Sequence, residues 1–596
     1  MVLPAKGWLC VDVETEGSPW DGHLLSISVS DPLDPEVFTS AFQAIPDWLL
    51  GVLADPDVGT VEHTLYDARW LRLAGVDLQG PIADTRVMAW NVDENTKLDL
   101  ESLVFRYLSR RMDKRLRQVG GKVKFKTDDG DLVPIEEAEW DQMRRYNEDD
   151  TRQTAALFNL LLPMQPKDWE QQVKLTSVLL DMECAGLPID METLEWTRES
   201  YAMTRDQLKA DLTKDLPEAF NINSADQVAA YLFLPEFNLS SRYRKEDGEP
   251  EGFVTEKEGR LYSHGHYVVE GLGMTPGKWT ESEKRPKVDN KTLAVKYSKH
   301  PWVTQFLEYQ KLNKILGTYL EGLPRYVHDG RVYGTFNQAG TVSGRLSSAS
   351  PNMQNLPRRG TYGADIRRLF KGNLVIADFS QLEPRLYAHW SQDPKLLEIY
   401  RGGLDVYKTT GMAVFDVDYR DVSDLQREIC KALVLSMGYG AQARKVAEIL
   451  SIAGYPTTQK EAQAYLEAMR AAYPRFFEWR EEVVSQSHDA GYVTTLAGRR
   501  RHIGYSGTES AWKAERQAVN SVIQGSAADI VNATMLEVAD IPSVRTLVQV
   551  HDELVLEHYG NPDLEAVQYA GEAGHGYVLD VPLVFEPKVV DSWDMK

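Results

Sequence analysis

The 596-residue sequence predicts an α+β fold divided among several domains. At about 150 residues per domain, the length alone suggests roughly four units. Short strands rich in Val and Leu occur near residues 10, 376 and 550, and long amphipathic helical runs separate them. Hydrophobic residues make up 43% of the chain and charged residues 26%, which is ordinary for a globular protein able to bury several cores.

Composition excludes several classes of protein. The three cysteines, Cys10, Cys184 and Cys430, are far apart and form no CxxC pair, which argues against a disulfide framework or a zinc site. The amino terminus has no basic segment followed by a long apolar run, and no stretch of about 18 apolar residues occurs. We therefore expect a cytoplasmic protein with no membrane association, in the host cytoplasm if the source is viral.

The formal charge of −23 argues, taken alone, against a nucleic-acid partner, because phosphate binding depends on Lys and Arg. Net charge is a sum, however, and an acidic protein can carry local basic tracks. Candidates are Arg499 to Arg501 and the run from Arg106 to Lys126, although most such runs are solvated faces.

A hairpin near the carboxyl end carries an unusual turn. Two apolar strands within residues 546–557 are separated by His551, Asp552 and Glu553, where Gly, Pro or Asn would be expected. Two adjacent carboxylates at an apolar turn repel each other and lose solvation unless a cation is present. A solvated charged turn is the alternative interpretation of this segment alone.

A second strand, residues 374–378, ends on Asp378 and breaks into a helix. Asp378 and Asp552 each stand at the end of an apolar strand, so a fold that pairs these strands brings the two carboxylates together. Two carboxylates with divalent cations between them are what two-metal phosphoryl transfer requires.

Residues 426–440 predict a helix that ends at glycine. Four residues on it are spaced by four, so each lies about 40° from the last and they share one slowly turning face. These residues are Arg427, Lys431, Leu435 and Tyr439. Two cations followed by a hydrophobe and an aromatic ring suit a nucleoside triphosphate lying along the helix, although two basic residues at this spacing are also common on solvated helices.

The amino-terminal region carries a separate set of acids. Asp12 and Glu14 point to one face of a predicted strand, because side-chain direction repeats every two residues. Asp67 leads into an apolar helix, and Tyr146 and Asp150 lie four apart on another helix. A single Asp-x-Glu is weak evidence for a functional site, but the ordered set of four acids is stronger evidence.

Residues 166 to 330 predict long amphipathic helices, interrupted at 235–287 by a stretch rich in Gly, Pro, Glu, Lys and Arg. This insertion is interpreted either as a disordered excursion or as a small subdomain that contacts duplex DNA or a partner.

In order along the chain, the strand at Asp378, the helix at 427–440 and the His551-Asp552-Glu553 hairpin resemble motifs A, B and C of family A DNA polymerases. The resemblance extends to residues 341–357 and to the segment 515–525, and it covers nearly the whole chain from residue 8, the insertion excepted. It implies a right-hand polymerase with palm, fingers and thumb. The expected division is 1–165 exonuclease, 166–330 thumb with the 235–287 insertion, 331–400 first palm part, 401–510 fingers and 511–596 second palm part.

The resemblance also implies roles for individual residues. Asp378 and Asp552 hold two Mg²⁺ ions, with Glu553 nearby in support, and Lys431 is the candidate for protonating pyrophosphate. The residues that would bind the deoxynucleoside triphosphate are Arg427, Lys431, Leu435, Tyr439, Glu383, Gln381 and Tyr407, with Glu383 as the steric gate against a ribose 2′-hydroxyl. The residues that would hold primer-template DNA are Arg345, Asn352, Gln354, Arg516, Asn520, Gln524 and His551.

The amino-terminal acids resemble the DEDD-type 3′-to-5′ exonucleases with a tyrosine, an α/β ribonuclease H-like domain. Asp12, Glu14, Asp67 and Asp150 would hold two further Mg²⁺ ions, Tyr146 would orient the attacking water, and Mn²⁺ can substitute. Proofreading members usually have asparagine where this chain has His63.

Other departures affect the polymerase motifs. Leu435 stands where most members have Phe or Tyr, and Tyr407 where bacterial members have histidine. The chain begins almost directly in the exonuclease strand, leaving no room for a 5′ nuclease domain, so we expect a bacteriophage replicative enzyme. We further expect a monomer, with a processivity factor or DNA contacting the insertion.

Two alternatives stay open. A single-subunit RNA polymerase or reverse transcriptase has chemically similar motifs A and C, although Glu383 and the editing domain argue against it. A non-catalytic DNA-binding accessory subunit is the other, and intact carboxylates at both sites argue against that.

Overall fold

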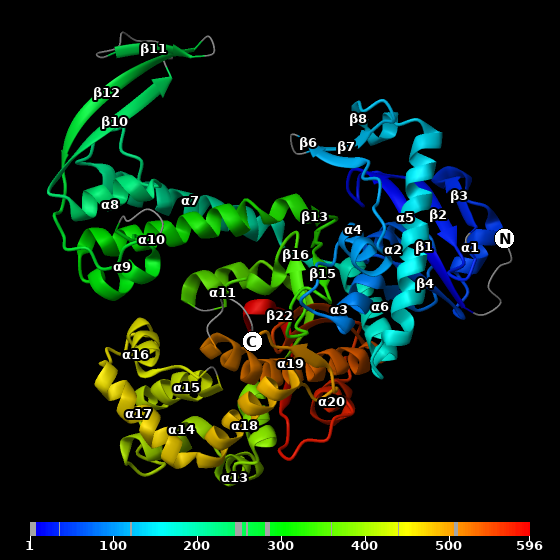
Figure 1. Ribbon diagram of the computed structural model, residues 1–596. Helices are drawn as coiled ribbons and strands as arrows, with labels where there is room; N and C mark the ends of the chain where they lie inside the picture. The colour runs from blue at the N-terminus through cyan, green and yellow to red at the C-terminus, as the bar shows by residue number, and fades with distance from the viewer. Residues whose placement is uncertain are drawn as a thin grey trace. The chain divides into compact units, whose positions relative to one another are not determined.

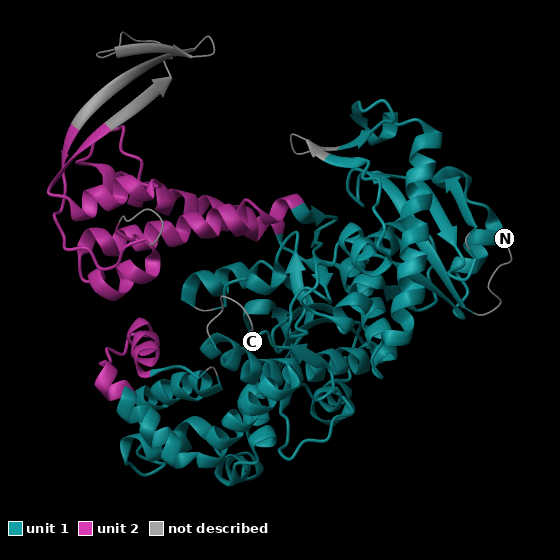
Figure 2. Cartoon of the chain, in the orientation of Figure 1, with its two compact units in different colours: residues 1–190, 326–442, 463–596 teal, residues 191–325, 443–462 magenta. Residues whose placement is uncertain are grey.

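The computed structural model describes the chain except for residues 1–6, 35, 120–121, 245–252, 258–259, 281–285, 359, 439, 506–510 and 596, and describes no side chains at 118–123 or 240–267. The chain forms two compact units (Figure 2). The first comprises residues 1–190, 326–442 and 463–596, and the second comprises residues 191–325 and 443–462. The division into five segments expected above stays a prediction.

A mixed five-stranded sheet lies at the amino-terminal end of the first unit (Figure 1), in the order β3-β2-β1-β4-β5. Its strands are β1 (Gly7–Glu16), β2 (His23–Ser30), β3 (Val37–Ala41), β4 (Val58–Glu62) and β5 (Ile82–Asp84). Strand β2 is antiparallel to both β1 and β3, whereas β4 is parallel to β1 and β5 is parallel to β4. The strand predicted around Asp12 is therefore the central strand of the sheet.

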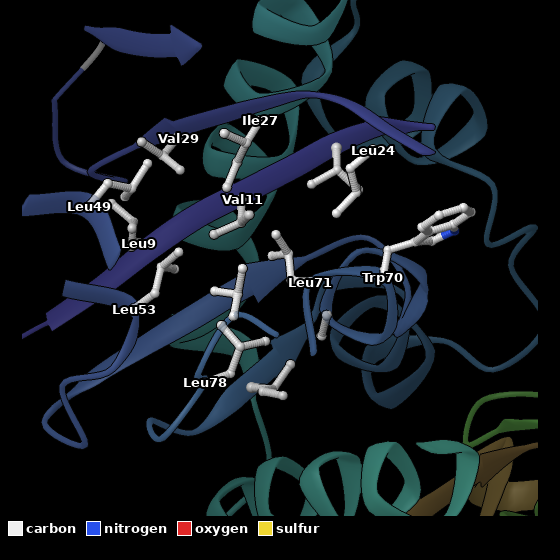
Figure 3. Packing of buried hydrophobic residues seen from close by; sticks show 14 of the residues in the cluster. Leu9, Val11, Leu24, Ile27, Val29, Leu49, Leu53, Trp70, Leu71 and Leu78 are labelled. Carbon is white, nitrogen blue, oxygen red and sulfur yellow. The ribbon is translucent and has the colours of Figure 1, made fainter. Parts of the chain in front are cut away.

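Alternation along β1 separates its two faces. Leu9, Val11 and Val13 pack on one face against residues of α1 and α2, as the close view of this core shows (Figure 3). Cys10 belongs to a second core on the opposite face, together with Phe158 of helix α5. Asp12 and Glu14 follow Cys10 at two-residue steps, so they lie on the face that α5 covers.

Helices and a small antiparallel sheet surround this core. The helices are α1 (Asp47–Leu53), α2 (Tyr66–Leu73), α3 (Thr85–Val92), α4 (Leu100–Leu103), α5 (Trp140–Leu161) and α6 (Trp169–Ala185), and the small sheet consists of β6 (Leu116–Val119), β7 (Lys122–Lys126) and β8 (Leu132–Pro134). Helix α3 begins where the Asp84 carboxylate accepts a hydrogen bond from the Arg86 backbone N–H at 2.7 Å.

A second sheet in the first unit has four antiparallel strands in the order β20-β21-β17-β22. They are β17 (Lys371–Phe379), β20 (Val544–Val550), β21 (Glu553–His558) and β22 (Phe585–Ser592). Central strand β17 is buried from Leu374 to Ala377, which explains its continuous apolar sequence. The predicted hairpin is thus β20 and β21, joined at His551 and Asp552.

Further helices of the first unit are α11 (Gly360–Arg368), α12 (Leu382–Ser391), α13 (Pro394–Arg401), α14 (Val406–Phe415), α15 (Asp424–Gly438), α18 (Pro474–Ala490), α19 (Ala511–Ala539) and α20 (Leu564–Tyr569). Of these, α19 packs against β20 and α20 against β22. The short strands are β9 (Leu187–Pro188), β13 (Val327–His328), β14 (Arg331–Val332), β15 (Thr335–Asn337), β16 (Ser347–Ala349), β18 (Tyr492–Thr494) and β19 (Arg500–His502). None of the helices in the described part of the chain is long and apolar enough to cross a membrane.

The second unit is mainly helical. Its helices are α7 (Met191–Thr213), α8 (Ala225–Phe233), α9 (Asn290–Tyr297), α10 (Pro301–Ile315) and α16 (Ala443–Ile452), while α17 (Gln459–Ala472) begins within it. Within the insertion, β10 (Glu236–Arg244), β12 (Arg260–Glu270) and β11 (Phe253–Lys257) form an antiparallel sheet (Figure 1). The described part of the insertion is therefore a small sheet, as the subdomain interpretation expected, and not a structureless loop.

Candidate active sites

The first candidate site is a cleft of about 740 Å³ in the first unit, at the end of the four-stranded sheet. Asp378 and Asp552 both line it. In the sheet, Asp378 lies opposite Glu553, and the Phe379 N–H donates to the Asp552 carbonyl at 3.0 Å. His551 adopts a φ of +60°, which turns the chain between the strands. The structure therefore brings together the two carboxylates that the strand patterns singled out.

The electrostatics of this cleft favour a bound cation. Burial and the neighbouring Asp378 raise the pKa of Asp552 to about 6. The half-exposed guanidinium of Arg358 lies 3.4 Å from the Asp378 carboxylate. Sequence reasoning missed Arg358, although it directly follows the polar segment that ends at Pro357.

Glu553, the other acid of the turn, is buried. Its side chain is 1% exposed, and Oε1 accepts hydrogen bonds from Arg367 Nη1 at 3.0 Å and Trp593 Nε1 at 2.7 Å. Glu553 is absent from the lining of the cleft, which Asp378 and Asp552 share. It is therefore part of a buried ion pair next to Asp552, and its supporting role at the cation site stays a prediction. Sequence reasoning missed this pair because its members are distant along the chain.

Helix α15 brings three of its predicted residues, Arg427, Lys431 and Leu435, to the same cleft. The guanidinium of Arg427 has a partner, since its Nε lies 2.8 Å from the Asp405 carboxylate, and it lies over the Tyr407 ring at 5.3 Å. Tyr407 also lines the cleft.

Asp405 and Tyr407 lie at the start of α14. Asp405 is the N-cap, accepting from the Tyr407 backbone N–H at 2.8 Å, so one carboxylate fixes both α14 and Arg427. Burial raises the pKa of Tyr407 to about 12, so its phenol is neutral. Tyr439 lies outside the described residues.

Two further predicted residues of the cleft, Arg345 and Glu383, form an ion pair. Arg345 Nη2 lies 2.5 Å from Glu383 Oε1 at the start of α12. Gln381 precedes this helix in the left-handed region at φ +59°, and its side chain accepts from the Tyr400 hydroxyl at 3.2 Å. Lys431 and Glu383 therefore face one cavity from different helices.

The predicted DNA contacts fall in two groups. Asn352 accepts from the Gln354 backbone N–H at 3.1 Å, and Gln354 in turn donates to the Gln549 side chain at 2.8 Å. His551 and Gln549 line the cleft with the carboxylates, and sequence reasoning missed Gln549.

The second group lies on helix α19. Arg516, Asn520 and Gln524 recur every four residues and are all half-buried. The Arg516 guanidinium lies 3.8 Å from the centre of the Trp512 ring. These three side chains give one face of the helix a row of polar groups.

The second candidate site is a separate cleft of about 750 Å³ beside β1. Ligand atoms of Asp12, Glu14 and Asp150 all lie within 4.8 Å of one another. Asp67 lines the same cleft, with a carboxylate oxygen 3.2 Å from the Val13 backbone N–H. Tyr146 is also in the lining, so all five predicted residues meet there.

Burial and mutual repulsion dominate the electrostatics of this second cleft. Burial raises the pKa values of Asp12, Glu14 and Asp67, and neighbouring acids raise them further. Burial also raises the pKa of Asp150, to about 7. Several crowded carboxylates with raised pKa values form a hard oxygen set that a divalent cation would neutralise. Burial raises the pKa of Tyr146 as well, so this phenol stays protonated.

Two residues missed by sequence reasoning support these acids. Asn147 is fully buried and donates its side-chain amide to Asp12. Glu62, also fully buried, accepts from the Ala68 backbone N–H at 2.9 Å and so anchors the helix that carries Asp67. The helix that carries Tyr146 and Asp150 is α5, which begins at Trp140.

His63 also lines the second cleft. Its Nδ1 lies 2.9 Å from the Thr85 hydroxyl, and burial lowers its pKa to about 3. The imidazole is therefore neutral at physiological pH.

Comparison with known proteins decides the family. The family model for DNA polymerase family A matches residues 263–595, which is more than half of the chain. The chain belongs to DNA polymerase family A. This match includes the first cleft and begins after the residues of the second, which lies in residues 12–150.

Curated relatives of this family A chain are bacterial. DNA polymerase I of Pseudomonas aeruginosa is 30% identical over 562 residues, covering 91% of this chain and 57% of the relative. DNA polymerase I of Geobacillus stearothermophilus is 30% identical, and the match covers 84% of this chain and 54% of the relative. The thermostable DNA polymerase I of Thermus filiformis is 32% identical, and the match covers 71% of this chain and 48% of the relative. The family A chain thus spans about half the length of the curated relatives it matches.

A solved structure shares the fold of the family A chain from end to end. The POL domain of Pol1 from M. smegmatis, in complex with DNA primer-template and dNTP, aligns with a TM-score of 0.78 and 24% identity. The alignment covers 99% of this chain and 96% of that chain. The polymerase fold with mixed α and β content, expected from the motifs, is thereby confirmed.

Proposed function

We propose that this chain is a template-directed DNA polymerase that extends a primer 3′ end with deoxynucleoside triphosphates. One observation carries the proposal. Asp378 and Asp552, from distant parts of the chain, meet in a cleft that also contains Arg427 and Lys431 of α15. The two carboxylates could bind metal ions, and the neighbouring Arg and Lys side chains could bind phosphates. Together they are complementary to a metal-bound triphosphate.

The residues of the first cleft fit divalent metal ions. The raised pKa of Asp552 indicates two carboxylates close enough to repel, and hard oxygen ligands suit Mg²⁺ or Mn²⁺. Asp378 and Asp552 would hold the two ions, with Glu553 fixing the turn from inside the protein. Bound Mg²⁺ would lower the pKa of the primer 3′-hydroxyl and neutralise the charge of the triphosphate.

The chain's own side chains would orient the nucleotide. Arg427, held by Asp405, and Lys431 would contact the phosphates, and Lys431 would pass a proton to the leaving pyrophosphate. The neutral phenol of Tyr407 would donate a single hydrogen bond. Leu435 offers an aliphatic surface to the sugar, and Tyr439 would stack at the templating position.

Other residues of the first cleft would select the sugar and bind DNA. Glu383, paired with Arg345, would crowd a ribose 2′-hydroxyl, with Gln381 shaping the start of its helix. Arg345, Asn352, Gln354 and His551 would contact primer and template near the cleft. The polar row on α19, Arg516, Asn520 and Gln524, would extend that contact along the duplex.

We propose a second activity, 3′-to-5′ removal of nucleotides, for the cleft beside β1. Its crowded carboxylates fit two Mg²⁺ ions held by Asp12, Glu14, Asp67 and Asp150, which would supply an activated water. Tyr146, kept protonated, would orient that water. Together the two clefts would give synthesis with proofreading.

Primer extension tests the proposal. A primed template with a matched or a mismatched 3′ end is incubated with deoxynucleotides, with Mg²⁺ or with a chelator. We expect template-encoded extension that needs Mg²⁺, and excision of the mismatch before extension. Absence of extension under all conditions would favour the accessory-subunit alternative, and faster extension with ribonucleotides would favour an RNA polymerase.

The biological setting is part of the proposal. A monomeric replicative enzyme of a bacteriophage, acting in the host cytoplasm, stays our expectation from the sequence. The small sheet formed by β10, β11 and β12 would contact DNA or a processivity factor. Deleting residues 236–270 should then shorten the product made per binding event.

A further inference from the structure

A tryptophan of the amino-terminal domain contacts the loop that carries Arg345, a residue of the first cleft. Trp90 lies on α3, is 3% exposed, and donates its indole N–H to the Thr341 carbonyl at 3.0 Å. Ala339 packs in the same small cluster as Trp90 and Val87. The loop 339–345 is thus held from a domain that the family match does not include.

Most of the backbone carbonyls of this loop accept hydrogen bonds from side chains of the protein. Arg499 donates to the Ser343 carbonyl at 2.7 Å, and the Thr341 hydroxyl donates to the Arg345 carbonyl at 2.7 Å. Asn532 donates to the Gly344 carbonyl at 3.5 Å. A backbone held at four points cannot shift one residue without breaking a hydrogen bond, so the position of Arg345 depends on all of them.

Trp90 supports two of these hydrogen bonds, its own to the Thr341 carbonyl and the one that Arg499 donates to the Ser343 carbonyl. Its ring lies 5.1 Å from the Arg499 guanidinium, which is 6% exposed and also paired with Asp529 at 3.3 Å. Gly344 is in the left-handed region at φ +84°, and a Cβ there would lie 2.4 Å from Arg499 Nη2. Arg499 is therefore wedged between the indole and the loop.

The position of the loop would affect a bound nucleotide through one ion pair. Arg345, at the end of the loop, is paired with Glu383, which lines the cleft. We propose that Trp90 is a positioning residue of the polymerase site, which sets the place of Arg345 and through it the orientation of Glu383. This inference rests on the proposed polymerase function and assigns to the amino-terminal domain a part in sugar selection.

Two substitutions at Trp90 test it. Trp90→Phe keeps a ring over Arg499 but removes the N–H donor, and Trp90→Ala removes both. The matched control is Trp48→Phe, a tryptophan on α1 of the same domain that is 38% exposed and packs against Phe38. All variants carry Asp12→Ala so that primer degradation does not interfere.

The readout is single-nucleotide incorporation with a deoxynucleotide and with the matching ribonucleotide, giving kcat/KM for each. We expect Trp90→Phe to lower the preference for the deoxynucleotide by about fivefold, the equivalent of one net hydrogen bond, and Trp90→Ala to lower it further. A loss of stability alone would scale both values equally and leave the preference unchanged.

The outcomes separate cleanly. If Trp48→Phe extends normally and Trp90→Phe keeps the same preference as Trp48→Phe, the positioning role is overturned while the polymerase function stands. If the parent and Trp48→Phe both fail to extend with any nucleotide, the polymerase function itself fails and the inference falls with it. Should Trp90→Ala not fold, Trp90→Phe still decides the question.

Discussion

Arg367 and Glu553 form an ion pair of 3.0 Å in the interior of the protein, although they lie 186 positions apart in the chain. Their side chains are 5% and 1% exposed. Trp593 closes the pair, donating its indole N–H to Glu553 at 2.7 Å while its ring lies 4.5 Å from the guanidinium of Arg367. The second acid of the hairpin turn therefore ties that turn to α11 and to the carboxyl-terminal segment.

This pair predicts a structural effect for a residue of the catalytic motif. Glu553→Ala leaves the Arg367 guanidinium buried without its partner, so we expect the free energy of unfolding to fall by roughly 3–5 kcal/mol. Urea denaturation measures it, with the exposed Glu565→Ala as a control expected to change by less than about 0.5 kcal/mol. A Glu553→Ala variant of unchanged stability but lost extension would instead place Glu553 at the metal ions.

The two clefts should be separable by mutation. We expect Asp378→Asn to reduce primer extension by roughly a thousandfold or more while excision persists, and Asp12→Ala to do the converse, because each removes a proposed metal ligand from one site only. Extension and excision of one labelled primer measure both activities. Equal loss of both activities in either variant would show that the clefts do not act independently.

The pKa of Asp552, raised to about 6 by burial and Asp378, predicts a pH dependence. The protonated carboxyl cannot bind a cation, so extension should fall as the pH drops through about 6. If Asp552 holds Mg²⁺ as proposed, protons and Mg²⁺ compete for it, and raising the Mg²⁺ concentration should move the midpoint to lower pH. Initial rates at a low and a high Mg²⁺ concentration measure this, and a midpoint that ignores Mg²⁺ would argue that another group titrates.

His63 should not act as a titrating group. Burial lowers its pKa to about 3, so its imidazole is neutral throughout the neutral pH range. We expect the ratio of excision rates between the parent and His63→Asn to stay constant across that range. Single-turnover excision of a single-stranded primer measures the ratio, and a change centred near the ordinary histidine value of about 6.5 would refute the assignment.

Much of both sites could be predicted from the sequence. An acid at the end of an apolar strand, or acids at two-residue steps along one, marks a chemical site because burial without a cation is unfavourable. The spacing of four along 427–435 predicted a common face, and Arg427, Lys431 and Leu435 do line one cleft. The pairing of Tyr146 with Asp150 on α5 was predicted in the same way.

What local patterns could not predict were partners from distant segments. Arg358 beside Asp378, Asp405 holding Arg427 and Gln549 beneath Gln354 follow from packing, which brings unrelated segments together. The sheet of the insertion was also left open between two interpretations, because the many Gly, Pro and charged residues of 235–287 outweighed the short alternation at Phe237 and Leu239.

The hairpin turn shows where the division lies. The sequence alone determined that two carboxylates stand between apolar strands and that Asp378 ends another, and the resemblance made Asp552 the expected metal ligand. Why Glu553 does not line the cleft was decided only by tertiary structure. Arg367 and Trp593 arrive from other elements and neutralise Glu553 inside the protein, leaving Asp552 at the cleft, since a buried carboxylate is stable only where donors surround it.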